Sequence, residues 1–410
     1  MAETPPNPAG PLAGVTVLDL SRVLAGPWAT QALADLGAEV IKIKRPGAGD
    51  DTRHWGPPFA VAADGGQGDA AYFFSANRGK RSVTVDIARP EGAALVRVLA
   101  EKADVLVENF KVGGLRKYGL DYDSLAAANA RLVYCSITGF GQTGPDAGRA
   151  GYDYMIQAMG GLMSITGEEG RPPVKVGVAV ADLFAGLYAS NAILAALLHA
   201  RATGEGQHID IALFEAQAAM LANQATNWFV SGEVPRRLGA AHPNLAPYQP
   251  LPTRDGALVV AVGNDGQFRA LCRALGAPEL GEDPRFETNA RRVGHRAELT
   301  AALEALTPGR ATHDWIEVLE AVGVPCGPIN TVEEVFAEPQ ARARGLVVEQ
   351  ARADLETPVR SVASPMRLSA TPVSYRVPPP ALGQDTEAVL GERLGLTTDR
   401  IAALRTLGVI

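Results

Sequence analysis

Residues 15–43 read VTVLDLSRVLAGPWATQALADLGAEVIKI, and the fold class follows from their pattern. The apolar, β-branched run Val15–Leu20 predicts a strand, and Glu39–Ile43 predicts a second one. Between them Pro27–Leu36 predicts a helix, because proline is favoured in the first turn of a helix and glycine, here Gly37, at its end. A strand, a crossing helix and another strand form a βαβ unit, whose two strands run parallel in one sheet.

The same alternation continues along the first third of the chain. It predicts a strand at Ser82–Asp86, a helix at Pro90–Ala100, and strands at Asp104–Val107 and Arg131–Ile137. Repeated βαβ units predict an α/β fold, in which helices cover both faces of a mostly parallel sheet. Ligands of such sheets bind in loops beyond the carboxyl ends of the strands. Those loops are residues 21–27, 44–53, 108–110 and 138–145.

A chain of 410 residues with 47% hydrophobic residues is long enough for two or more domains or subdomains. A second region begins near residue 225. There, Tyr248–Val262 predicts two strands around an Asp255-Gly256 turn, and Gln267–Leu275 predicts a helix. Further helical segments, a strand around Val347 and terminal helices follow.

Charge and composition exclude several classes of function. The net charge is −7 and no long basic run is present, so we expect no nucleic-acid partner. The apolar stretch Leu183–Leu198 is shorter than the roughly 20 residues of a membrane span, so we expect no membrane insertion. The first ten residues show neither a signal peptide nor a transit peptide and are expected to form a disordered leader.

The cysteines and histidines add two further expectations. Cys135, Cys272 and Cys326 are widely spaced, which is typical of a reducing compartment and predicts a cytoplasmic protein without a disulfide framework. The six histidines have no second ligand at metal-binding spacing, so we expect no metal site.

Gly139-Phe-Gly-Gln-Thr-Gly144 has the spacing of a dinucleotide-binding motif directly after a predicted strand. That motif requires its third glycine to pack within a helix whose N-terminus meets the pyrophosphate. Here Pro145, Gly148 and Gly151 follow at once, which predicts an irregular loop. A nicotinamide enzyme is therefore disfavoured.

Asp182 is a lone carboxylate in apolar sequence, between a strand-like segment at 176–180 and an apolar helical segment that begins at Leu183. One interpretation is a helix N-cap, which accepts hydrogen bonds from free backbone N–H groups. The other is a carboxylate nucleophile in a poorly hydrated pocket. The local sequence is compatible with both.

Several motifs in order resemble the class III CoA-transferases, also called the CaiB-BaiF family, from Leu12 to Ile410. The segments that carry the resemblance are Leu18–Pro27, Leu36–Lys42, Asn77–Arg81, Asp104–Phe110, Thr138–Pro145, Val180–Asp182, Thr203–Gly206 and Gly323–Pro328. The resemblance implies a large Rossmann-like domain formed by both chain ends, a smaller middle domain and an interlocked homodimer. The corresponding ranges here are 1–215 and 330–410 for the large CoA-binding domain and 225–325 for the small domain.

The resemblance also implies roles for individual residues. Asp182 would be the nucleophile that forms anhydride and aspartyl-CoA thioester intermediates, with CoA thioesters as substrates and no permanently bound cofactor. Tyr152 would donate a hydrogen bond to a carboxylate or anhydride, and Gly239 is a candidate backbone donor, equally compatible with an ordinary turn. The implied CoA-binding residues are Val23, Leu24, Ala25, Arg45, Asn109, Phe110 and Lys117.

Two alternatives are a 2-methylacyl-CoA racemase of the same family and a CoA-binding protein without turnover. Racemases carry a histidine where this chain has Tyr152, and a neutral phenol is a poor base at pH 7. The presence of Asp182 disfavours a protein without turnover.

The substrate class follows from segments that resemble the dicarboxylate branch of the family, which uses succinyl-CoA and glutarate. These segments are Asp50–Phe59, Tyr134–Pro145, Arg149–Asp153, Gly161–Gly167 and Ala241–Tyr248. A dicarboxylate presents a second carboxylate that needs a cation, and the candidates in sheet-end loops are Arg22, Arg53 and Arg149. A structural ion pair is the other interpretation of each arginine.

Overall fold

The computed structural model describes residues 10–410, which form two compact units. Unit 1 comprises the described residues up to 160 together with 177–220 and 342–410, and unit 2 comprises 161–176 and 221–341. Sequence-based ranges placed 161–176 and 330–341 in the large domain instead. Segment 161–176 belongs to unit 2 because its carbonyls at Gly167 and Arg171 accept hydrogen bonds from Gly239 and Arg237. Of the first ten residues, which were expected to form a leader, residues 1–9 lie outside the described part, and Gly10 is buried.

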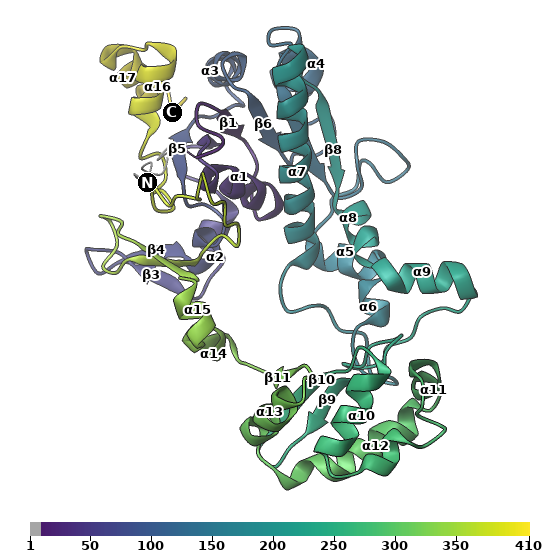
Figure 1. Cartoon of the computed structure of the whole chain (residues 1–410). Coiled ribbons are helices and arrows are strands. Elements are labelled where there is room, and N and C mark those ends of the chain that lie inside the picture. Colours follow the sequence, from purple (N-terminus) through teal and green to yellow (C-terminus); the bar gives the residue numbers. More distant parts are fainter. Residues whose placement is uncertain (1–9) are drawn as a thin grey trace, which may run out of the picture. The chain divides into compact units, whose positions relative to one another are not determined.

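Unit 1 is built on a six-stranded sheet in which every pair of neighbouring strands is parallel (Figure 1). The order in space is β5-β2-β1-β6-β7-β8. The bounds are β1 (Thr16–Asp19), β2 (Glu39–Lys44), β5 (Lys80–Thr84), β6 (Val105–Glu108), β7 (Val133–Thr138) and β8 (His208–Ala212). In chain order, β1, β2 and β5 extend the sheet to one side, and β6, β7 and β8 then extend it to the other side. Ligand sites of open parallel sheets lie at such a reversal.

The expected parallel sheet is confirmed, with two differences. Sequence analysis missed β8, in which His208 and Asp210 alternate with apolar residues as is typical of a half-exposed edge strand. The strand expected at 176–180 is wrong: α7 (Val180–Thr203) begins there, and the preceding residues are irregular. Val174 and Val178 are 49% and 56% exposed, so β-branched residues near this segment pack against no sheet.

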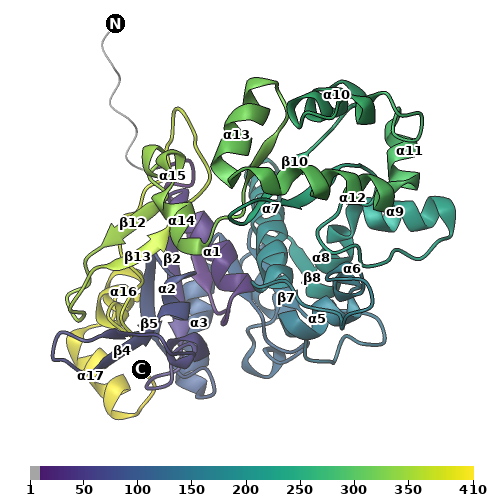
Figure 2. The same cartoon turned by 90° about the horizontal axis from the view of Figure 1, so that it is seen from below.

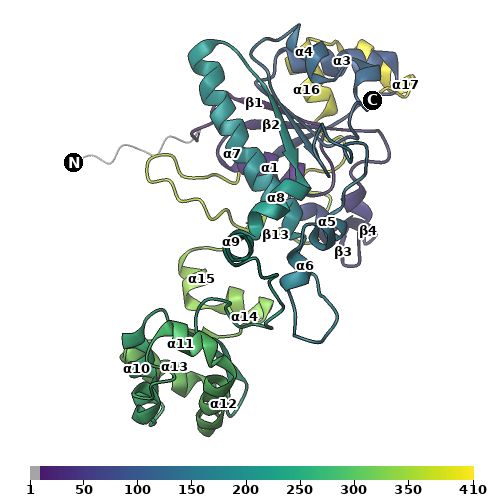
Figure 3. The same ribbon diagram turned by 90° about the vertical axis from the view of Figure 1, so that its right-hand side faces the viewer.

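Helices cover both faces of the sheet (Figure 3). One face packs against α1 (Ala25–Asp35) and α7, and the other against α3 (Pro90–Glu101), α16 (Thr386–Leu394) and α17 (Thr398–Thr406). Successive strand residues serve opposite faces: Val17 and Val107 belong to the first core, Leu18 and Leu106 to the second. Because α16 and α17 complete the second core, both ends of the chain build unit 1.

The rest of unit 1 consists of short elements around this sheet. They are β3 (Phe59–Val61), β4 (Gln67–Ala70), α2 (Ala71–Phe74), α4 (Tyr122–Ala126), α5 (Asp153–Met159), α8 (Leu213–Met220), β12 (Val347–Gln350) and β13 (Val359–Val362). The hairpin of β12 and β13 brings Val359 against Phe73 and Phe74 of α2, so the C-terminal segment also packs on the N-terminal part (Figure 2). The strand expected around Val347 is confirmed as β12.

Unit 2 has a three-stranded antiparallel sheet in the order β11-β10-β9, formed by β9 (Tyr248–Pro252), β10 (Ala257–Ala261) and β11 (Cys326–Pro328). Its helices include α6 (Leu162–Ile165), α9 (Ala222–Ser231), α10 (Asp265–Ala274), α11 (Asn289–Gly294), α12 (Arg296–Leu306), α13 (Thr312–Ala321) and α14 (Val332–Ala337). The predicted hairpin and the helix after it are confirmed as β9, β10 and α10. The edge strand β11 was missed because it ends at Pro328, and proline is tolerated in strands mainly at edges.

Helix α7 is longer than the sequence analysis expected. It has 24 residues, and by length and composition alone it could cross a membrane; among residues 10–410 no other helix could. The apolar helix is therefore not too short for a membrane span, contrary to the expectation from residues 183–198. Its buried residues include Ala185, Ala189 and Ile193, which belong to the core formed with α1 and the sheet. A helix buried in a protein core can have the same length and apolar composition as a membrane span.

Gly186 allows α7 to approach α1 closely. A Cβ atom added there would lie 2.7 Å from the Ala25 carbonyl oxygen and 3.2 Å from Trp28. We expect Gly186→Ala to lower the free energy of unfolding by roughly 1–3 kcal/mol, the usual cost of overpacking, although alanine is the better helix former. Gly391→Ala in α16 is the matched control, because an added Cβ there would have its nearest neighbour at 3.9 Å. It should stabilise by up to about 1 kcal/mol in urea denaturation, and equal effects of both changes would contradict the close approach.

Candidate active site

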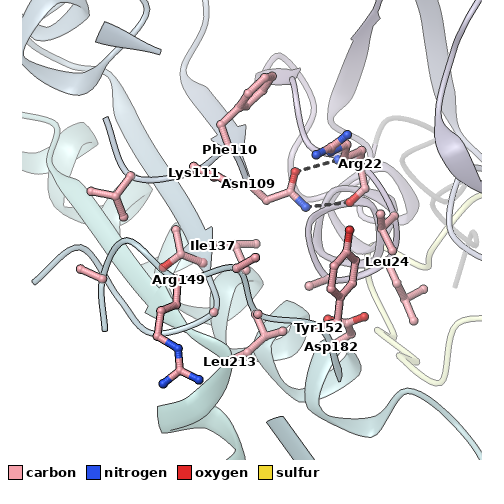
Figure 4. Close-up of a pocket in the computed structure, with 18 residues that line it drawn as sticks. Arg22, Leu24, Asn109, Phe110, Lys111, Ile137, Arg149, Tyr152, Asp182 and Leu213 are labelled. Carbon is pink, nitrogen blue, oxygen red and sulfur yellow. Dashed lines mark hydrogen bonds between the residues drawn. The ribbon is translucent and has the colours of Figure 1, made fainter. Parts of the chain in front are cut away.

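A cavity of about 150 Å³ lies beyond the carboxyl ends of β1, β6 and β7 in unit 1 (Figure 4). Its walls come from the loops that follow these strands, from the first turn of α7 and from Leu213, which follows β8. The expected location, the strand ends of a parallel sheet, is therefore where the structure has a cavity. Nine predicted site residues line it: Arg22, Val23, Leu24, Ala25, Asn109, Phe110, Arg149, Tyr152 and Asp182.

Four predicted site residues are not among those that line this cavity. Arg45 is exposed, and Lys117 is exposed with its ammonium 4.8 Å from the centre of the Tyr118 ring. Gly239 belongs to unit 2, where its backbone N–H donates to the Gly167 carbonyl at 3.0 Å. Because that N–H is already engaged, Gly239 is corrected from a candidate oxyanion donor to a turn glycine, with a φ of +60°.

Arg53 is the fourth, and its charge is already paired. Its guanidinium lies 2.7 Å from the Asp69 carboxylate, donates to the Pro380 carbonyl at 2.9 Å, and stacks 3.7 Å from the centre of the Phe73 ring. The residue is only 5% exposed. Of the two interpretations of Arg53, the structural ion pair is the one that these contacts support.

Asp182 is the third residue of α7 and is not its N-cap, which is Ala179. The N-cap interpretation is therefore wrong. The side chain is 9% exposed and faces the cavity (Figure 4). Burial, and then the negative charge of Asp153, raise the pKa of Asp182 to about 7. The positive end of the α7 dipole acts in the opposite direction, since it favours the ionised carboxylate.

Asp153 is a functional neighbour to which the sequence analysis gave no role. Its Oδ1 atom accepts the Ala181 backbone N–H at 2.9 Å and so supplies the hydrogen bond that an N-cap side chain would give to α7. Its position directly after Tyr152 was the available signal. Tyr72 is a second neighbour: burial, and then the charges of Asp182 and Asp153, raise its pKa to about 12.

Tyr152 is 61% exposed and lines the same cavity as Asp182 (Figure 4). It precedes α5, for which it is the N-cap residue. The Tyr152 ring is therefore not packed in the core of unit 1.

Asn109 joins the loop after β6 to the loop after β1. Its side-chain oxygen accepts the Arg22 N–H at 2.9 Å, and its amide donates to the Arg22 carbonyl at 2.7 Å, as the dashed lines in Figure 4 show. The next residue, Phe110, donates its backbone N–H to the buried Glu108 carboxylate at 2.7 Å. Asn109 therefore bonds another loop and not its own backbone, and it fixes one wall of the cavity.

The cationic groups at the cavity are Arg22, Arg149 and Lys111, and sequence analysis did not single out Lys111. Arg22 contacts Asp51 at 3.3 Å and Arg149 contacts Asp146 at 3.0 Å. Both pairs are about half exposed, and exposed ion pairs of this kind are weak. Either arginine can exchange its partner for an anionic ligand at little cost.

The loop 139–152 follows β7 and precedes α5, so its glycines open no helix. A Cβ atom added to Gly139 would lie 2.6 Å from the Gly151 Cα atom. These glycines permit the two ends of the loop to cross, which agrees with the rejection of a dinucleotide-binding motif.

Comparison with known proteins identifies the class of enzyme. The model of CoA-transferase family III matches residues 12–386, nearly the whole chain. The protein belongs to CoA-transferase family III and is a CoA-transferase by family.

Among its relatives is a succinate–glutarate CoA-transferase of Agrobacterium fabrum, 54% identical over 391 residues that cover 94% of this chain and 96% of the relative. The succinyl-CoA:glutarate CoA-transferase of Homo sapiens is 45% identical over 408 residues, with 98% of this chain and 91% of the relative covered. A crystal structure of a CAIB/BAIF family protein from Brucella suis is 52% identical, covers 94% of this chain and 100% of that chain, and has a TM-score of 0.83.

The raised pKa of Asp182 predicts a pH-dependent loss of stability. The Asp182 carboxyl group binds its proton more tightly in the folded protein than in the unfolded chain. Its protonation therefore adds to the free energy of unfolding fully below about pH 4, and this added stability is lost as the pH rises through about 7. The neutral variant Asp182→Asn should therefore exceed the wild type at pH 8 by roughly 1–4 kcal/mol in free energy of unfolding, and should match it near pH 4. Urea denaturation at both pH values measures this difference. Asp123→Asn, a change of a side chain that is 79% exposed, is the control; a pH-independent difference for Asp182→Asn would contradict the raised pKa.

Proposed function

We propose that the protein transfers CoA from succinyl-CoA to a dicarboxylic acid such as glutarate, with Asp182 as the nucleophile. The observation that carries the proposal is a buried carboxylate in a cavity whose other walls are the expected CoA-binding loops. The substrates are proposed from the relatives named as succinate–glutarate CoA-transferases.

The proposed reaction needs one carboxylate and no permanently bound cofactor. An Asp182 oxygen attacks the thioester carbonyl, the carbon–sulfur bond breaks, and a mixed anhydride and CoA thiolate form. The thiolate attacks the aspartyl carbonyl, the anhydride bond breaks, and the donor acid leaves from an aspartyl-CoA thioester. The acceptor carboxylate then attacks this thioester, and the thiolate returns to the acceptor's carbonyl, which regenerates Asp182 and releases the new acyl-CoA.

Burial of Asp182 suits this sequence of steps. Both acyl intermediates would hydrolyse in contact with water, and a side chain that is 9% exposed is largely shielded from it. Because burial raises its pKa to about 7, Asp182 is ionised at slightly alkaline pH and has little hydration to lose before it attacks.

The cavity of about 150 Å³ is smaller than the 300–1,000 Å³ of sites for drug-sized ligands. We propose that it takes the thioester end, with Val23, Leu24 and Ala25 against the pantetheine and with Asn109 and Phe110 on the opposite wall. Arg45 and Lys117 are exposed cations in unit 1, suited to the phosphates further along the CoA molecule. The Tyr152 hydroxyl is proposed as a hydrogen-bond donor to the reacting carboxylate or anhydride.

The proposal includes the architecture and setting expected from the family. The strand order of unit 1 supports a Rossmann-like large domain, with unit 2 as the small domain. An interlocked homodimer would cover apolar side chains of α7 that a single chain leaves exposed, among them Leu187, Tyr188 and Leu198 at 48%, 45% and 70%. A cytoplasmic location remains part of the proposal.

Neither alternative gains support from the site. A racemase of this family would carry a histidine as the base at position 152, and this chain has a tyrosine there. A binding protein without turnover has no need of a buried carboxylate that destabilises the fold at neutral pH.

Asp182→Ala should abolish CoA transfer, a loss of at least about 10⁴-fold in kcat, because both intermediates form on its carboxylate. With donor alone, the wild type should give a hydroxylamine-sensitive adduct that mass spectrometry places on Asp182. Asp123→Ala, which removes an exposed carboxylate of unit 1, is the control and should retain activity. Turnover by folded Asp182→Ala would disprove the mechanism.

Arg149 and Arg22 are proposed to bind the distal carboxylate of the acceptor acid. Arg149→Ala should lower kcat/KM for glutarate roughly 10- to 100-fold, the equivalent of about 1.5–3 kcal/mol for a hydrogen bond to a charged group. The loss for pentanoate, which has one carboxylate, should be much smaller, and Arg22→Ala should be tested in parallel. Arg405→Ala is the matched control, since Arg405 forms a similar exposed ion pair with Glu387 on α16. Equal losses for both acids would assign Arg149 a structural role.

A further inference from the structure

Five charged side chains are buried below the loop that joins β1 to α1. They are Asp19, Lys42, Lys44, Asp50 and Lys80, each between 0% and 8% exposed. We refer to them as the buried charge cluster. Three lysines and two aspartates are costly to desolvate, and hydrophobic side chains would commonly be more stable at such positions. The proposed reaction gives these side chains no chemical step.

The buried charge cluster holds successive backbone groups of the loop. The Lys44 ammonium donates to the Leu20 carbonyl at 3.2 Å and to the Ser21 carbonyl at 2.5 Å, and Lys42 donates to the same Ser21 carbonyl at 3.0 Å. The Asp19 carboxylate accepts the Ser21 N–H at 2.9 Å. Asn109 binds both the N–H and the carbonyl of Arg22, the residue after Ser21. Polar side chains therefore hold the backbone of the loop from Leu20 to Arg22.

Asp50 continues this series at Val23. Its Oδ1 atom accepts the Val23 N–H at 3.2 Å, while its Oδ2 atom lies 3.0 Å from the Lys42 ammonium. At the other end of the cluster, Lys80 lies 3.1 Å from Asp19 and donates to the Pro27 carbonyl at 2.9 Å. The cluster therefore holds the loop at its beginning, its middle and its entry into α1.

Val23 explains why the loop needs such support. Its φ is 69°, a left-handed conformation that is a genuine outlier for a β-branched residue. Strain of this kind persists only where the surroundings enforce it, and it is concentrated at binding and catalytic sites. The loop is also closed tightly, because a Cβ atom on Gly26 would lie 2.3 Å from the Ser21 Cβ atom.

We propose that Lys44 and Asp50 are positioning residues, through which the buried charge cluster holds Val23 in its left-handed conformation and presents Val23 and Leu24 to the acyl-CoA. This inference rests on the proposed function, because it assigns the loop to CoA. Both side chains act through the backbone of the loop and not on the reacting atoms. Burial, and then the nearby charge of Lys42, lower the pKa of Lys44 to about 7, and burial lowers the pKa of Lys80 to about 7 as well. Lys44 is the lysine of the cluster that donates to both the Leu20 and the Ser21 carbonyls, so it is the one to replace.

Kinetics of Lys44→Met test the positioning role. This variant leaves two lysines opposite two aspartates, so the positive and negative charges of the cluster become equal in number and the protein should fold. We expect the KM for succinyl-CoA and the Kd for CoA to rise at least 10-fold, while the KM for glutarate changes less than twofold. Arg78→Met is the matched control: it removes a buried cation of unit 1 that pairs with Asp35 at 2.7 Å, and it should lower the Tm without changing the KM for succinyl-CoA.

The outcomes separate this inference from the proposed function. Unchanged values for folded Lys44→Met, beside an active wild type, would overturn the positioning role alone. An equal rise in KM for Arg78→Met would also overturn it, because any loss of a buried cation would then loosen the site. A wild type that binds CoA but does not transfer it would refute the proposed function, and the Kd for CoA would still test the positioning role.

Val23 provides a test that requires neither activity nor a folded Lys44→Met. Glycine adopts a φ of 69° freely and alanine does not, so Val23→Gly should have a Tm several degrees above that of Val23→Ala. At Ala25, in the first turn of α1, the ordinary order should hold and Ala25→Gly should lower the Tm. A Val23→Gly variant less stable than Val23→Ala would show that the loop is not strained and would overturn the positioning role.

Discussion

Parallel pairing of β1 with both β2 and β6 is the constraint on which the rest of unit 1 depends. Parallel neighbours cannot be joined by short turns, so the connections are long, and α1 and α3 among them cover opposite faces of the sheet. On the second face, α16 and α17 return from the far end of the chain and complete the cover that α3 begins. The same geometry gathers the loops after β1, β6 and β7 at one edge, and this is why residues about 160 positions apart, from Arg22 to Asp182, line one cavity.

The strands and helices that sequence analysis predicted are those whose burial gives a clear period. Val17 and Leu18 alternate between two cores, and such continuous apolar runs are typical of strands buried on both faces. The predictions were wrong or missing for segments in which strand formation depends on a neighbouring strand. The edge strands β8 and β11 contain polar residues or proline, and the valines at 174–180 resemble a strand but have no sheet edge beside them. Segment 161–176 joins unit 2 through hydrogen bonds to Arg237 and Gly239, which no local pattern reports.

The candidate site was predicted in the same uneven way. Loop residues at strand ends, such as Val23, Asn109 and Tyr152, line the cavity because the topology alone places them there. For Arg53 and Gly239 the sequence left two interpretations open, because it does not reveal whether a guanidinium or an N–H is already engaged, here by Asp69 and by the Gly167 carbonyl. The contribution of Asp153 was missed because its charge raises the pKa of Asp182 through space, although the two residues are 29 positions apart in the chain.

The site combines several features that each reduce the stability of the fold. Asp182 is buried beside a second carboxylate, three lysines are buried below the neighbouring loop, and Val23 is held in a left-handed conformation. Random placement of such features would be selected against, because one or two kcal/mol is a large fraction of the stability of a domain. Their concentration around one small cavity suits the proposed reaction, because water-sensitive acyl intermediates need a poorly hydrated nucleophile and a rigid loop that brings a flexible thioester to it.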